Sequence, residues 1–338
     1  MKSLIRKLVE TPSPSGYESQ IRAVIRSEVE PLADELHVDN LGSLIARKGQ
    51  VGPGGLKIML SAHMDEIGVM ATHVDEKGFV RFMPVGAVYV RNCLGSRVRF
   101  LNGASGVIGY ERVDDNNRLP AFDQMFIDVG AGSRAECPVQ VGDVGVFDRP
   151  FIELGQRLVS KAMDNRISVA ILIETLRQLA AEAAPIPNQV FFAFTVQEEV
   201  GVRGATAAAF GLDPDLGLAV DVTATGDTPK GIKMEVSLGQ GPAIKVRDQG
   251  LLADPRIVGW MVAAAERAGI PHQMEVLEFG TTDARAIQLV RAGVPAGCLS
   301  IPCRYIHSPS EMVDYSDVQN GVRLLVELLK QPVQLGEL

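Results

Sequence analysis

The chain has 338 residues, of which 46% are apolar and 22% charged, as in a globular protein with a large core and room for more than one domain. Its formal net charge of -8 argues against a nucleic-acid or anionic-membrane partner, because both select for clustered Lys and Arg. The N-terminus lacks an apolar segment of signal-peptide length and no run reaches the roughly 20 apolar residues of a membrane span, so we expect a cytoplasmic protein.

The N-terminal part of the chain alternates between helical and extended patterns. Residues 16–34 have helical periodicity, and Ser15 with Glu18 forms a predicted capping box at the start of this helix. Residues 35–49 are then predicted as strand, turn and strand, and residues 56–62 ("LKIMLSA") as a short buried strand.

The pattern changes between about residues 66 and 156, where almost nothing is helical. Segments such as "IGVMATHVDEKGFVRFMPVGA", "SRVRFLNGASGVIGYERV" and "VGDVGVFDRPFIEL" alternate apolar and polar residues and are punctuated by Gly, Asn and Asp. This pattern is typical of a small β-barrel or sandwich.

Helices and strands alternate again from Leu158 onward. Helices are predicted at 165–183, 254–269, 282–293 and 316–330, and strands at 188–196, 216–222, 273–278 and 296–302. Such alternation predicts an α/β sheet with helices on both faces. We therefore expect one α/β domain, residues 1–65 and 157–338, interrupted by an all-β insertion, residues 66–156.

Acidic and imidazole side chains follow the predicted core strands of the α/β domain. Because the carboxyl ends of such strands face one crevice, side chains far apart in sequence should converge there. They are His63 and Asp65, Glu198 and Glu199, Asp221, and His307, together with Asp164 at the start of a predicted helix. So many carboxylates in one cleft would repel each other unless cations lay among them. Mixed nitrogen and oxygen ligands suit Zn²⁺, Co²⁺ or Mn²⁺ better than Ca²⁺, so we predict a two-metal site.

Each of these features also has an ordinary explanation when taken alone. Asp164 is a typical N-cap residue, and a double Glu after a strand usually lies in a solvated loop. The metal site is favoured by the joint placement of all the features. His73 and His272, which follow no core strand, are interpreted as structural residues.

The four cysteines, Cys93, Cys137, Cys298 and Cys303, include no CxxC pair and no disulfide-framework spacing. We interpret them as reduced structural thiols. Cys303 lies near His307, but no base at a characteristic spacing marks it as a nucleophile.

Six motifs together resemble the tetrahedral aminopeptidase family, a group of dinuclear-metal peptidases with a zinc-peptidase-like fold. The family includes glutamyl and deblocking aminopeptidases and its members are often labelled endoglucanases. The motifs are "SAHMDEIGVM", "SKAMDNRISV", "TVQEEVGVRGA", "VDVT", "VLEFGTTDA" and "SIPCRYIHSPSEMVD". They occur in the family's order over essentially the whole chain.

The resemblance implies roles for individual residues. Asp164 would bridge two divalent metal ions, which would be Zn²⁺ or Co²⁺, with Mn²⁺ as a further candidate. His63 and Asp221 would bind one ion, and Glu199 and His307 would bind the other. Asp65 would orient the His63 imidazole. Glu198 would remain free of metal and act as the general base.

The implied activity is removal of N-terminal residues from short peptides that carry a free amino group. The resemblance further implies that the β-rich insertion is a dimerisation domain, and that dimers assemble into hollow tetrahedral dodecamers. Three positions depart from the usual family motifs: Thr281, Lys230, and Cys303. These departures leave substrate selectivity open.

Two readings from other classes remain. A glycoside hydrolase would use Glu198 and a second carboxylate as an acid and base pair, but this explains neither His63 nor His307. One Trp and 5% aromatic residues also supply little for a sugar cleft. A non-catalytic scaffold would keep the metals only as a structural staple, which gives no role to an unligated Glu198.

Overall fold

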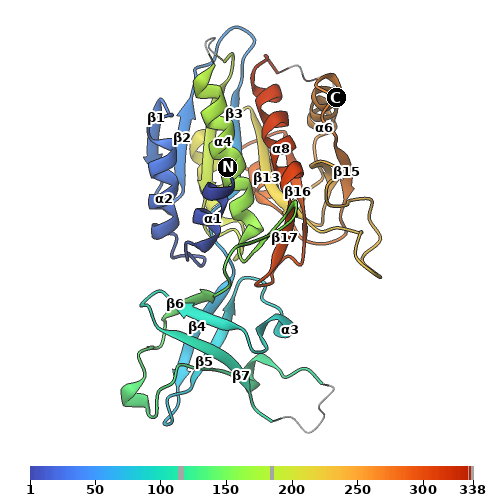
Figure 1. Cartoon of the computed structure of the whole chain (residues 1–338). Coiled ribbons are helices and arrows are strands. Elements are labelled where there is room, and N and C mark those ends of the chain that lie inside the picture. Colours follow the sequence, from blue (N-terminus) through green and yellow to red (C-terminus); the bar gives the residue numbers. More distant parts are fainter. Residues whose placement is uncertain (113–117, 183–185, 334, 336–338) are drawn as a thin grey trace.

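The computed structural model describes residues 1–112, 118–182, 186–333 and 335. An α/β part and a separate barrel make up the chain, and several connections between them lie at one end of the sheet (Figure 1). The predicted α/β sheet with helices on both faces and an all-β insertion is thereby confirmed. Val113 and Ala183, at the ends of two predicted elements, lie outside the described residues.

The main sheet is mixed, with four parallel strands at its centre. Its path runs β1-β2-β12-β3-β13-β16-β17-β11-β10, with β14 paired to β16 and β15 paired to β14. The strands are β1 (Glu35–Val38), β2 (Leu44–Lys48), β3 (Lys57–His63), β10 (Ile152–Leu154), β11 (Arg157–Ser160), β12 (Gln189–Thr195), β13 (Leu216–Thr223), β14 (Ala243–Arg247), β15 (Gln273–Val276), β16 (Ala296–Arg304) and β17 (Glu311–Asp314). Strands β12, β3, β13 and β16 are parallel, so their carboxyl ends lie at the same edge.

Helices cover both faces of this sheet. On one face are α1 (Lys2–Glu10), α2 (Ser19–Val29), α4 (Met163–Ala181), α6 (Pro255–Arg267) and α8 (Tyr315–Leu329), and on the other α5 (Arg203–Leu212) and α7 (Asp283–Gln288). Strand β12 shows the reason, since Phe192 and Phe194 join the core under α4 while Phe191 and Ala193 join the core under α5. Within the described residues, every helix is too short or too polar to cross a bilayer.

The inserted unit is a closed six-stranded antiparallel barrel. Its order is β4-β5-β8-β7-β6-β9, with β4 (Gly68–Val74), β5 (Val80–Val85), β6 (Arg97–Phe100), β7 (Ser105–Tyr110), β8 (Met125–Asp128) and β9 (Val144–Phe147). Short helical turns interrupt it at α3 (Val90–Cys93), η1 (Phe122–Gln124) and η2 (Arg134–Glu136). Strand β10, inside the range predicted for the insertion, pairs with β11 in the main sheet.

The predicted capping box at Ser15 and Glu18 is wrong. Helix α2 begins at Ser19, and the side chain that accepts from its first turn is that of Ser13, whose hydroxyl lies 3.2 Å from the Ile21 N–H. The Ser15 hydroxyl instead donates to Asp65 Oδ2 at 2.6 Å, and Glu18 Oε1 accepts from the backbone N–H groups of Gly16 and Gln197. Other partners, among them the distant Asp65 and Gln197, have therefore taken both side chains that the local pattern assigned to the cap.

Helices α1 and α5 and strands β14 and β17 are absent from the sequence predictions. Helix α5 reads "RGATAAAFGL", whose small residues give no clear apolar stripe. Strands β14 and β17 have only five and four residues, too few for a period-2 pattern to stand out. These elements depend on the sheet against which they form.

A buried ion-pair cluster lies where the chain passes from the sheet to the barrel. Glu66 accepts hydrogen bonds from Lys161 Nζ at 2.7 and 2.9 Å, and its side chain is 3% exposed. Arg166 lies 3.4 Å from the same carboxylate, and the backbone N–H of Ser13 donates to it at 3.0 Å. The cluster thus joins the outgoing connection at Glu66 to the returning connection before α4.

We predict that Lys161→Met lowers the free energy of unfolding by about 3 kcal/mol, near the low end for a broken buried pair because Arg166 remains to pair Glu66. Urea unfolding at a fixed protein concentration measures this. The control is Lys2→Met, which breaks the exposed pair with Glu153 and should cost less than about 1 kcal/mol. Equal losses in the two variants would contradict the role of the buried cluster.

Candidate metal and active site

His63 lies at the carboxyl end of β3, with its two ring nitrogens directed to different carboxylates. Its Nε2 is 3.0 Å from Asp164 Oδ1, and its Nδ1 is 3.4 Å from Asp65 Oδ1. The strand fixes the ring because β3 is buried on both faces and continues into this residue. Nε2 therefore faces the interior of the site, while Asp65 lies behind the ring.

Asp65 is fully buried and accepts hydrogen bonds from two other segments. Ser15 Oγ donates to Oδ2 at 2.6 Å. The backbone N–H groups of Glu198 and Glu199 donate to Oδ1 at 3.0 Å and to Oδ2 at 3.2 Å. Asp65, two residues after His63, thereby fixes the loop that carries Glu198 and Glu199.

Asp164 lies between the two predicted histidines. Its Oδ1 is 3.0 Å from His63 Nε2 and its Oδ2 is 3.3 Å from His307 Nε2. The amide of the next residue, Asn165, donates to the carbonyl of Val220 at 2.9 Å, which ties the start of α4 to β13. The two carboxylate oxygens are therefore directed to two separate imidazoles.

The remaining predicted residues complete the same cluster. Glu199 Oε2 is 3.3 Å from His307 Nε2, and from His63 Nε2 the distance to Asp221 Oδ1 is 3.8 Å and to Glu198 Oε2 is 4.0 Å. All of the sequence-predicted site residues thus meet at one place. A cavity of about 810 Å³ opens onto all of them except the buried Asp65.

The cluster places several carboxylates in a buried space. Burial raises the pKa of Glu198 well above its ordinary value, although His63 opposes the rise; the charges of Asp221 and Glu199 raise it further. Burial likewise raises the pKa of Asp221 well above its ordinary value and also raises that of Glu199. The ionised forms of these carboxylates are therefore disfavoured unless a cation lies among them.

The same carboxylates raise the pKa values of the two imidazoles. Burial lowers the pKa of His63, but its contacts with Asp164 and Asp65 outweigh burial and leave the pKa well above its ordinary value. Burial also opposes protonation of His307, but the charges of Glu199 and Asp164 raise its pKa to about 12. A bound metal ion takes the place of such protons, because a ligating imidazole must be neutral.

The geometry fits a divalent metal. One candidate set of donor atoms, from His63, Asp164 and Glu199, lies within 4.8 Å of one another. Two ligands on a tetrahedral Zn²⁺ are about 3.3 Å apart, close to the 3.0–3.3 Å measured here between donor atoms. The buried oxygen Glu199 Oε1 lacks a hydrogen-bond partner in the described structure, which leaves it available to a cation.

The barrel contributes a wall of the site that the sequence patterns did not indicate. Asn92 Nδ2 donates to the carbonyl of His307 at 2.8 Å, and the Tyr89 ring lies 6.1 Å from the His307 ring. Gly86 has φ +79°, and a Cβ on it would lie 3.2 Å from Glu199 Cβ. In the sequence, Gly86 stands out only as a glycine among alternating apolar and polar residues, and this does not indicate that it contacts Glu199.

Two buried carboxylates beside the site were also missed. Asp283 accepts from Thr195 Oγ1 at 2.6 Å, and Thr195 is paired in register with His63. Glu311 accepts from the backbone N–H groups of Asp164 and His307. Both lie inside the quoted motifs, yet no spacing rule separates them from ordinary acidic residues.

The three positions that depart from the family motifs all line the cavity: Thr281, Lys230 and Cys303. Lys230 is exposed, with φ +53°. Burial, together with the charges of Glu311 and Asp164, raises the pKa of the Cys303 thiol well above its ordinary value. Cys303 is therefore held as a thiol, which agrees with its interpretation as structural.

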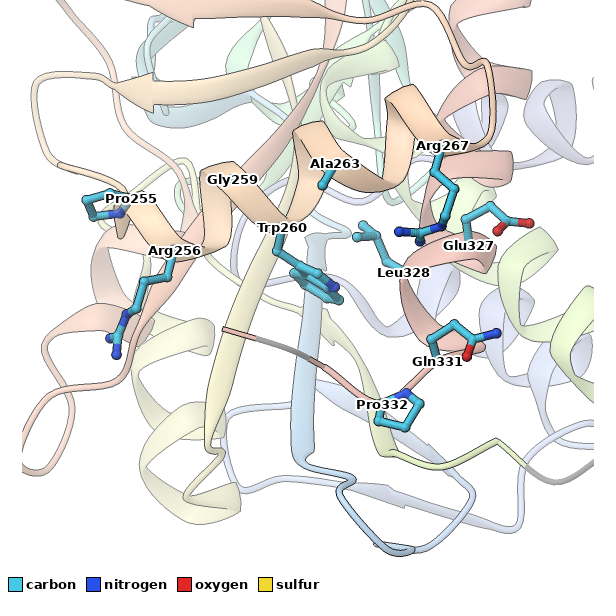
Figure 2. A pocket seen from close by; sticks show the side chains of 10 residues that line it. All are labelled: Pro255, Arg256, Gly259, Trp260, Ala263, Arg267, Glu327, Leu328, Gln331 and Pro332. Carbon is cyan, nitrogen blue, oxygen red and sulfur yellow. The ribbon is translucent and has the colours of Figure 1, made fainter. Parts of the chain in front are cut away.

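A second hollow, of about 720 Å³, lies between α6 and α8 and contains none of the predicted site residues. Figure 2 shows the indole of Trp260 extending from α6 into it, with Arg267 and Glu327 at one side. Its walls hold no His or Cys. The predicted site residues thus line the other cavity and not this hollow.

Comparison with known proteins identifies relatives over nearly the full chain. The M42 glutamyl aminopeptidase model matches residues 42–324. A putative aminopeptidase of Acetivibrio thermocellus is 45% identical over 97% of this chain and 98% of its own length.

Solved structures are equally similar. An aminopeptidase from the archaeon Desulfurococcus kamchatkensis has 40% identity and a TM-score of 0.92, covering 97% of this chain and 94% of its own. The TET1 peptidase of Pyrococcus horikoshii, which can assemble into a tetrahedron or a large octahedral shell, has 32% identity and a TM-score of 0.87, covering 97% and 98%. Family model, relatives and fold agree along the chain, and the protein belongs to the M42 glutamyl aminopeptidase family of metallopeptidases, which includes the TET aminopeptidases.

Proposed function

We propose that the chain removes N-terminal residues from short peptides with two divalent metal ions, held by His63, Asp164, Glu199, Asp221 and His307. The observation that carries this proposal is the position of Asp164, whose two oxygens face His63 and His307 separately. Asp221 lies on the His63 side and Glu199 on the His307 side. Each imidazole thus has a second carboxylate beside it, with Asp164 shared between them.

When bound, such a pair of ions polarises a peptide carbonyl and lowers the pKa of a water molecule. Glu198 Oε2, 4.0 Å from His63 Nε2, is assigned to take the proton from this water and pass it to the leaving amine. Asp65 holds the His63 ring and, through the backbone of Glu198 and Glu199, the position of this base.

The size and charge of the cavity support action at a chain end. A volume of about 810 Å³ is within the range of small-ligand sites and suits a short peptide segment. The surrounding carboxylates favour a substrate ammonium group over a blocked amide. The two histidines, and membership of an aminopeptidase family, give the glycoside hydrolase alternative no support.

The two adjacent glutamates should respond differently to substitution. Glu198→Gln removes the proton acceptor alone, so we expect kcat to fall by about 10²- to 10⁴-fold with KM and metal content little changed. Glu199→Gln should lower the occupancy of one metal position, and excess metal should restore part of the activity. Metal analysis and steady-state kinetics on both variants check this. Loss of an ion in the Glu198 variant alone would reverse the assignment.

Blocking the substrate amine should abolish cleavage. We expect a free peptide to be trimmed stepwise and its N-acetylated form to stay intact, because the acetyl group removes the ammonium charge. Mass spectrometry of both digests records the product ladder. Internal cuts in the blocked peptide would rule out an exopeptidase, and cleavage of a cellulosic substrate with no peptide turnover would favour a glycoside hydrolase.

Assembly into a closed oligomer is the third part of the proposal. The assembly of Pyrococcus horikoshii TET1 supports it, and the compact barrel provides a candidate dimerisation domain. Multi-angle light scattering should give about 440 kDa, twelve times the 36.3 kDa chain, or a smaller closed assembly of dimers. A single species at 36.3 kDa would contradict it.

A further inference from the structure

Glu311, the first residue of β17, is a buried carboxylate that contacts the backbone of two proposed ligands. Its Oε2 accepts from the Asp164 N–H at 2.9 Å and its Oε1 accepts from the His307 N–H at 2.8 Å. Its exposed fraction is 2%. Within the described part of the chain, the hydrogen-bond partners of the Glu311 carboxylate are these two backbone groups.

Burying a carboxylate is costly unless its oxygens are satisfied, and here no Lys or Arg among the described residues pairs with Glu311. The arrangement is therefore poorly explained as a stabilising ion pair. It is better explained by what the two N–H groups need. Both are donors only, so an acceptor must lie between them to keep both satisfied.

Neither partner has the backbone dihedrals of regular secondary structure. Asp164 has non-helical dihedrals, φ -75° and ψ 105°, at the start of α4. His307 has φ +59° in the loop between β16 and β17, a conformation uncommon for a residue with a side chain. Glu311 is the group that links these two irregular backbones, and β17 anchors it through pairing of Glu311 with Ser160.

We propose that Glu311 is a positioning residue, which sets the spacing of Asp164 and His307 so that the metal position they share with Glu199 is formed before the ion binds. This inference rests on the proposed two-metal function. It assigns Glu311 no contact with substrate. Its role is to hold the His307 Nε2 to Asp164 Oδ2 distance, 3.3 Å, near that of adjacent ligands on one ion.

Glu311→Gln is the direct test, because the amide oxygen can accept from one N–H only while the NH₂ group faces the other. The chain supplies a matched control in Asp317, which is fully buried and also accepts from two backbone N–H groups, those of Gly239 at 2.7 Å and Gly241 at 2.8 Å. Asp317 does not line the cavity of the site. Asp317→Asn thus breaks the same kind of clamp away from the proposed metals.

The measurement is Co²⁺ binding to the metal-free proteins, followed by visible absorption and by metal analysis after dialysis. Wild type and Asp317→Asn should bind two Co²⁺ ions with the same spectrum. Glu311→Gln should bind one of them about 10- to 100-fold more weakly, the range for loss of a residue that orients a metal ligand. Excess Co²⁺ should restore its absorption and its aminopeptidase activity together.

Glu311→Asp keeps the charge but is shorter by one methylene, and it should weaken the same ion by a smaller factor. If Glu311→Gln does not fold, the Co²⁺ affinity of Glu311→Asp tests the inference in its place. Wild-type affinity in the Gln or the Asp variant would overturn the inference, as would equal metal loss in Asp317→Asn. Wild-type protein that binds no second Co²⁺ would instead refute the two-metal function itself.

Discussion

The Asp65 carboxylate holds together three segments that are distant in sequence: the Ser15 turn, the His63 ring at the end of β3, and the backbone of Glu198 and Glu199. Such a buried charge is tolerable only because donors surround it, and each donor is thereby fixed. The other side chains of the site follow from the position of His63. Asp164 approaches His63 from α4, and its other oxygen places His307.

The site also shows how the fold accommodates groups that destabilise it. Burial and mutual repulsion disfavour the ionised forms of Glu198 and Asp221, and the surrounding sheet must supply the compensating stability. That sheet is well suited to this, since its central strands are buried on both faces by helices. The proposed ligands His63 and Asp221 lie at or near the carboxyl ends of β3 and β13, so most of the length of these strands remains apolar.

The parts of the site that follow a general rule could be predicted from sequence. The carboxyl ends of parallel strands converge, and this rule, helped by the family motifs, brought His63, Glu198 and Asp221 together in advance. Features that depend on how separate units dock could not be predicted. Asn92 belongs to the barrel, and nothing in its local sequence indicates contact with a residue 215 positions later. The Ser15 capping prediction failed for the same reason, because a distant carboxylate competes for the hydroxyl.

The position of the barrel within the chain also constrains the order in which the protein can form during synthesis. Strand β3 pairs with β12 and β13, which emerge from the ribosome only after the whole barrel has been made. The barrel strands pair only with each other, so this unit can close while β3 still lacks both neighbours. Until then the apolar faces of β3 have no sheet to join, and an unpaired apolar strand of this kind is a site at which chains can aggregate.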